Sequence, residues 1–120
     1  MNKNKFQAAR PEIKMHLWLE REGGVFFGQG RYDLLQKIQE LGSLKLAAQE
    51  MGISYRGAWG KIKRTEEIIG EKLIVKDSNK EGYHLTEFGK QFMNEFDSLH
   101  RDILEYAVKR SGEMLSRIYK

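Results

Sequence analysis

The segment SLKLAAQEMGISYRGAWGKI, residues 43–62, contains two short helical patterns joined by a glycine. Ala47 and Ala48 are small enough for two helices to approach each other closely at a steep angle. Gly52 tolerates the positive φ that a tight connection needs, and Ile53 is the apolar residue that fills the turn. This spacing is typical of a helix-turn-helix, although two packed helices without a DNA-binding role are the general alternative.

The second helix of the pair is predicted over residues 54–69, with Ser54 as its N-cap and Gly70 after its end. Its helical periodicity directs Ala58, Ile62, Thr65 and Ile69 inward, and the opposite side then carries Tyr55, Arg56, Trp59, Gly60 and Lys63. Glycine inside a helix costs about 1 kcal/mol relative to alanine. We therefore expect Gly57 to allow close helix packing and Gly60 to let the backbone approach a partner.

The charge of this helix is local. The formal net charge of the chain is only +4, but four basic residues and no acidic ones lie between residues 54 and 64, namely Arg56, Lys61, Lys63 and Arg64. Tyr55 and Arg56 can donate hydrogen bonds to phosphates or base edges, while Lys63 and Arg64 can neutralise phosphates. Trp59 has two open interpretations, packing against the N-terminal hairpin or contact with DNA.

The flanking sequence predicts two hairpins and two further helices. Ile13, Met15, Leu17 and Leu19 alternate, as on one face of a strand. The predicted flanking elements are a hairpin over residues 13–28, a helix that Gly42 ends, a hairpin over residues 73–85 and a long helix capped by Thr86, while Ser43 caps the first helix of the pair. The fold class is mainly α with small β-hairpins (α+β), in the order of a winged helix-turn-helix.

Composition excludes several classes of function. The chain has 120 residues, 40% of them apolar and 32% charged, which suits one domain, and it has no cysteine. No apolar run reaches the roughly 18 residues of a membrane span, and the polar start lacks a signal-peptide core, so we expect a cytoplasmic protein. His16, His84 and His100 lack metal-ligand spacing, Gly28-Gln29-Gly30 lacks a third glycine, and the pair Glu66-Glu67 is assigned to ordinary helix surface. We expect no enzyme activity, metal or cofactor.

The longer segment LGSLKLAAQEMGISYRGAWGKIKRTEEIIGEKLIVKDS, followed by HLTEFG, resembles the DNA-binding domains of LysR-type regulators. The shared features are the Ala pair, the Ser after an apolar turn, "EE" before a glycine, "EKL", a basic wing residue and L-T-x-x-G. The core Ser54-Tyr55-x-x-Ala58-Trp59 is closer still to molybdate-responsive (ModE-type) regulators, whose short relatives carry a hairpin like residues 18–30. The resemblance covers about residues 13–99.

The resemblance implies which residues contact DNA. Positions matching Tyr55, Arg56, Trp59 and Gly60 would face the major groove, and Lys76 in the wing and Ser43 at a helix start would meet phosphate. The predicted DNA-binding residues are Ser43, Ser54, Tyr55, Arg56, Trp59, Gly60, Lys63, Arg64 and Lys76. The chain ends at Lys120, so we expect a stand-alone short form without an oxyanion (molybdate or tungstate) sensing domain. The wing tip, residues 77–82, is shorter and more mixed in charge than in the molybdate family.

The final helix has an apolar stripe with a mean spacing of 3.6 residues. This stripe continues beyond the part of the helix that the preceding domain can cover. Its second half either folds back or pairs with a second copy, and we favour a homodimer. The predicted interface residues are Phe96, Leu99, Ile103, Leu104, Tyr106 and Ala107. The predicted organisation is therefore a flexible tail (1–11), a DNA-binding domain (12–86) and a dimerisation helix (87–120), in a transcription regulator that binds double-stranded DNA. The alternative is a winged helix that serves as a protein-interaction module, with Tyr55 and Trp59 as anchors.

Overall fold

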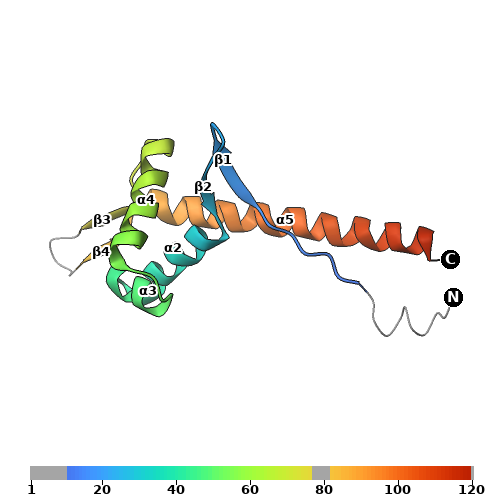
Figure 1. Ribbon diagram of the computed structural model, residues 1–120, viewed down its shortest axis with the longest axis horizontal. Helices are drawn as coiled ribbons and strands as arrows, with labels where there is room; N and C mark the ends of the chain where they lie inside the picture. Colours follow the sequence, from blue (N-terminus) through green and yellow to red (C-terminus); the bar gives the residue numbers. More distant parts are fainter. Residues whose placement is uncertain (1–10, 77–81, 120) are drawn as a thin grey trace.

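The computed structural model describes residues 11–76 and 82–119 (Figure 1). It is mainly helical with two separate antiparallel hairpins, as the sequence predicts. The elements are β1 (Trp18–Arg21), β2 (Gly24–Gly28), α2 (Gln29–Leu41), α3 (Leu44–Glu50), α4 (Tyr55–Ile69), β3 (Ile74–Lys76), β4 (Tyr83–Leu85) and α5 (Glu87–Ile118). The other elements gather around the first half of α5, and its second half extends far beyond them (Figure 1).

The helix-turn-helix forms where the local sequence places it. The Ser43 hydroxyl accepts a hydrogen bond from the Leu46 amide at 3.0 Å and so caps α3, and the Ser54 hydroxyl caps α4 by accepting from the Gly57 amide at 2.9 Å. Gly52 has φ +68°, as the tight connection requires. The role expected for Gly57 is different, because a Cβ there would meet the Ser54 hydroxyl oxygen at 3.0 Å and no other helix. Gly57 therefore makes room for the cap.

The core lies between α2, α3, α4 and the start of α5. Phe27 is fully buried at its centre, and its ring meets the edges of Phe92 and Phe96 at centroid distances of 4.8 and 4.9 Å. Large side chains such as these contribute about 1.5–3 kcal/mol each when buried. The remaining fully buried large side chains are Leu34, Leu35, Ile38, Leu44, Ile62, Leu73, Ile74 and Thr65. This core fixes α4 with its basic side outward.

The N-terminal hairpin is shorter than predicted. Its pairing begins at Trp18, which lies opposite Gly28, the last residue of β2, so residues 13–17 have no strand to pair with. The expected alternation holds only in part, since Met15, Leu17 and Leu19 are partly buried between exposed neighbours whereas Ile13 is exposed. Residues 11–17 instead run beside α5 (Figure 1), and Ile13 and Leu104 line one shallow groove there.

The wing, β3 and β4, is joined tightly to α5. Ile74 pairs with Leu85 and Lys76 with Tyr83, while residues 77–81 of the expected tip (77–82) lie outside the described residues. Thr86 caps α5 through the Gly89 amide, and its own amide donates to the Leu73 carbonyl at 2.9 Å. A Cβ at Gly89 would lie 2.4 Å from that same carbonyl oxygen, so only glycine fits at this approach. The wing is therefore fixed at its base.

None of the helices in residues 11–76 and 82–119 is both long enough and apolar enough to cross a membrane.

Candidate nucleic-acid interface

The exposed side of α4 lies between the two hairpins, with β3 and β4 on one side and β1 and β2 on the other (Figure 1). Ala58 and Ile62 face the core, whereas Tyr55, Arg56 and Gly60 are exposed. A Cβ at Gly60 would meet nothing within 4 Å, so no intramolecular neighbour requires glycine there. Among the described residues Arg56 has no acidic partner within ion-pair distance. These side chains are free to meet a ligand.

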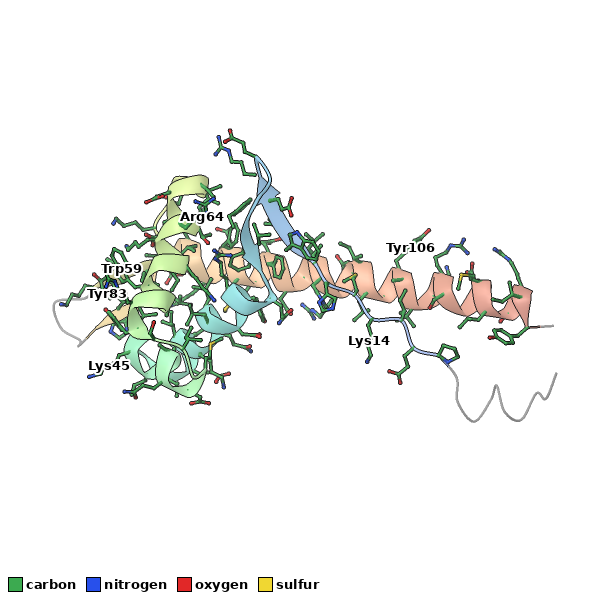
Figure 2. The ribbon with its side chains drawn as sticks, in the orientation of Figure 1. Lys14, Lys45, Trp59, Arg64, Tyr83 and Tyr106 are labelled. Atoms are coloured by element: carbon green, nitrogen blue, oxygen red, sulfur yellow. The ribbon has the colours of Figure 1, made fainter. Side chains whose placement is uncertain are left out.

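Trp59 lies on the wing side of α4, beside Tyr83 (Figure 2). The Lys63 ammonium lies 5.3 Å from the Trp59 ring centroid and 5.7 Å from that of Tyr83, so it bridges the two aromatic rings. The interpretation in which Trp59 packs on the N-terminal hairpin is therefore wrong. Trp59 is still 38% exposed, and its contact with DNA stays a prediction.

Glu66 corrects the assignment of the acidic pair to ordinary helix surface. Glu66 is only 9% exposed, and its carboxylate accepts hydrogen bonds from the Leu73 amide at 2.8 Å, the Ile74 amide at 3.2 Å and the Lys63 ammonium at 2.9 Å. Burial raises the pKa of this carboxyl, but the hydrogen bonds from Lys63 and the two amides outweigh it and hold the pKa below its ordinary value. Glu66 therefore ties the recognition helix to the start of the wing.

The burial of Glu66 had a signal in the sequence. It follows Ala58 by eight residues and Ile62 by four, so it shares their helix face. The hydrogen-bond donors to Glu66 could not be predicted from helical periodicity, because the amides of residues 73 and 74 belong to the wing. Lys63 is only 21% exposed in its side chain and is already paired with Glu66. Its predicted contact with phosphate therefore requires phosphate to share or replace this carboxylate.

The remaining DNA-binding candidates lie at the two borders of the α4 face. Arg64 lies on the side of α4 that faces the N-terminal hairpin (Figure 2), and a Cβ at Gly24 would be 3.0 Å from its guanidinium. Ser43 lies beside Gly82, just before β4 at the end of the wing away from its base, since a Cβ at Gly82 would be 3.7 Å from the Cβ of Ser43. Lys76 is exposed at the end of β3. The two serines act as helix caps, so their contact with phosphate stays a prediction.

The residues predicted for a dimer interface do not all lie together. Phe96 is 4% exposed and packs on Phe27 within the core, so its assignment to a partner-facing surface is corrected. Leu99, Ile103 and Tyr106 are exposed beyond the domain (Figure 2 labels Tyr106). Leu104 and Ala107 are partly buried, and Leu104 lies beside the N-terminal segment. The interface therefore stays a prediction for the exposed stripe.

No group of three or more His, Asp or Glu side chains in the described part of the chain is arranged to hold a metal ion.

A helix pair with a short connection, followed by a hairpin whose base contacts the second helix, defines a winged helix-turn-helix protein. The family model for bacterial regulatory helix-turn-helix proteins of the lysR family matches residues 31–90, which is half of the chain. The chain belongs to this family, a class of DNA-binding transcription regulators.

Known proteins resemble the chain in sequence and in fold. The chain is 31% identical to "Transcriptional regulator ModE" of Yersinia pestis over 73% of its own length and 35% of the relative's, and 28% identical to "Molybdenum transport protein ModE" of Azotobacter vinelandii over 83% and 38%. It thus spans about a third of the length of these curated relatives. The solved structure "Crystal structure of CbnR_DBD-DNA complex" shares the fold, with TM-score 0.51 and 23% identity over 76% of this chain and 97% of that one.

Proposed function

We propose that this regulator binds double-stranded DNA in a sequence-specific way, with α4 in the major groove and the wing against the phosphate backbone. The observation that carries the proposal is the exposed side of α4, which presents Tyr55, Arg56 and Gly60 between two hairpins. An α-helix fits the major groove, and an arginine can make two hydrogen bonds to one guanine there. Arg56 has no acidic partner among the described residues and is therefore available for that role.

The proposal includes a homodimer formed through the second half of α5. Leu99, Ile103 and Tyr106 lie on the helix face that Phe92 and Phe96 use for the core, but the described protomer leaves them 37–64% exposed. A second α5 offers matching apolar surface, and a two-fold axis would present two copies of α4 to DNA. Their spacing should be about 34–36 Å or a multiple of it, so the operator should be an inverted repeat.

The relatives' names do not extend this proposal to molybdenum. The chain matches only about a third of the length of each relative.

A second candidate function is a protein-interaction module. Tyr55 and Trp59 are exposed aromatic residues on one helix, and aromatic residues dominate protein interfaces. The salt dependence of binding to duplex DNA separates the two candidates. Several phosphate contacts per protomer give a log–log slope of about −4 to −8 for a dimer. A flat response of the full chain would contradict DNA binding and favour the protein-interaction module.

The variant Arg56→Ala tests whether Arg56 recognises a base. Lys109→Ala is the control, because it removes one charge from the exposed second half of α5. Loss of a bidentate contact should cost about 1–3 kcal/mol of discrimination at one base position per half-site. Competition binding with operators changed at one position measures this preference. Equal losses of affinity for operator and random DNA would refute the base-reading role of Arg56.

A further inference from the structure

Four cationic side chains lie together on the side of α4 that faces away from the wing. These residues are Arg21 in β1, Arg31 in α2, and Lys61 and Arg64 in α4. The Arg21 guanidinium donates to the Ile68 carbonyl at 3.0 Å, and the Arg31 guanidinium donates to the Lys61 carbonyl at 3.2 Å. We name these four residues the hairpin-side cluster. They come from three elements, so the fold itself brings them together.

The N-terminal hairpin is attached firmly to α4 at this cluster. The Thr65 hydroxyl is fully buried and donates to the Phe26 carbonyl of β2. Gly24 leaves room for the Arg64 guanidinium, which would lie only 3.0 Å from a Cβ at that position. The hairpin therefore holds its cations at a fixed place beside α4.

The cluster has no internal counter-charge. Within residues 11–76 and 82–119, none of its four side chains lies within 4.0 Å of a carboxylate oxygen. Two acidic residues on the same elements are engaged elsewhere, since Glu20 accepts from the Trp18 indole at 2.8 Å and Asp33 from Gln29 at 2.8 Å. Burial and the neighbouring Arg64 charge lower the pKa of Arg31. A cationic group held together without acids is stabilised by any anion that binds across it.

The cluster lies where DNA would supply that anion. The wing flanks α4 on one side and the N-terminal hairpin flanks it on the other (Figure 1). The major groove is about 12 Å wide and is bordered by a phosphate strand on each side, so a helix seated in it has backbone on both flanks. Lys61 and Arg31 also line an open groove of about 520 Å³ with Trp18, so they face solvent.

We propose that the hairpin-side cluster is a second phosphate-binding surface, which holds the DNA strand on the side of α4 opposite the wing. This inference rests on the proposed function. It assigns Arg21, Arg31 and Lys61 to the interface and gives Arg64 a place in the same group. The contacts are to backbone, so they position the protein and carry no base preference.

The test compares Lys61→Ala and Arg31→Gln with Lys109→Ala. The Lys61 side chain is exposed and makes no ion pair in the described structure, and glutamine at position 31 retains an amide donor for the Lys61 carbonyl. Each contact removed should lower the magnitude of the log–log salt slope by about 0.9 per protomer. At 0.1 M salt this corresponds to roughly an eightfold loss of affinity per contact, equal for operator and random duplexes. Lys109→Ala should leave both quantities unchanged, and Lys61→Arg should restore them.

Ethylation interference on the operator locates the contacts. The wild-type protein should be sensitive to ethylated phosphates on both flanks of the groove, and Lys61→Ala should lose sensitivity only on the flank opposite the wing. If the wild-type protein binds DNA with a steep salt slope but Lys61→Ala and Arg31→Gln behave like Lys109→Ala, the second surface is wrong and the proposed function stands. If the wild-type protein shows no salt-dependent binding, both fail. Should Arg31→Gln unfold, Lys61→Ala decides alone.

Discussion

Glu66 offers the sharpest test of how the wing is held. Replacing it by alanine removes the acceptor for the Leu73 and Ile74 amides and leaves the Lys63 ammonium without its partner. Leu73 and Ile74 are each 1% exposed, so their amides depend on the carboxylate for an acceptor. The loss therefore reaches buried groups on both α4 and β3.

The magnitude follows from these three hydrogen bonds. A buried donor left without an acceptor costs about 1–3 kcal/mol, and removal of one partner of a buried charge pair costs about 3–5 kcal/mol. Lys63 keeps some access to water, so we expect Glu66→Ala to lower the free energy of unfolding by about 3–4 kcal/mol. Glu66→Gln retains an oxygen for the amides and should lose about 1–2 kcal/mol.

The pKa of Glu66 gives the prediction a pH dependence. Because the folded-state pKa lies below the ordinary value of 4.5, the ionised carboxylate stabilises the fold fully above that value. This contribution is lost as the pH falls through the folded-state pKa. The difference in stability between the wild-type protein and Glu66→Gln should therefore be full at about pH 7 and shrink below about pH 4.5.

Urea unfolding followed by far-UV circular dichroism measures both effects. Glu67→Gln is the matched control, because Glu67 is the exposed neighbour of Glu66 and makes no ion pair among the described residues. We expect the control to stay within about 0.5 kcal/mol of the wild-type protein. Equal midpoints for Glu66→Gln and Glu67→Gln at neutral pH would refute the reasoning, as would a difference that persists unchanged in acid.

Three further changes test the remaining parts of the molecule. Gly60→Ala should raise the free energy of unfolding by up to about 1 kcal/mol, since its Cβ meets nothing, yet weaken DNA binding; unchanged affinity would contradict a close backbone approach to DNA. Gly89→Ala should destabilise the fold by about 1–3 kcal/mol because its Cβ overlaps the Leu73 carbonyl, and wild-type stability in thermal unfolding would disprove that packing. Ile103→Glu should produce folded monomers in sedimentation, whereas a wild-type protein that is already monomeric at micromolar concentration would remove the dimer.

The sequence by itself determined the elements and their ends. The caps at Ser43, Ser54 and Thr86 and the positive φ at Gly42, Gly52 and Gly70 were all predictable. Each cap or turn depends on hydrogen bonds or backbone geometry within about four residues. These local determinants do not depend on how the helices pack together. The buried face of α4 followed for the same reason, because helical periodicity is a local property.

Tertiary structure decided which polar and aromatic groups meet. The amides that Glu66 accepts from lie seven and eight residues away, and Tyr83 meets Lys63 only when the wing folds back on α4. Arg31 reaches the Lys61 carbonyl across 30 residues of sequence. The partners of these groups depend on how separate elements pack around Phe27. The residue pattern of one segment cannot predict which residues from distant segments will contact it.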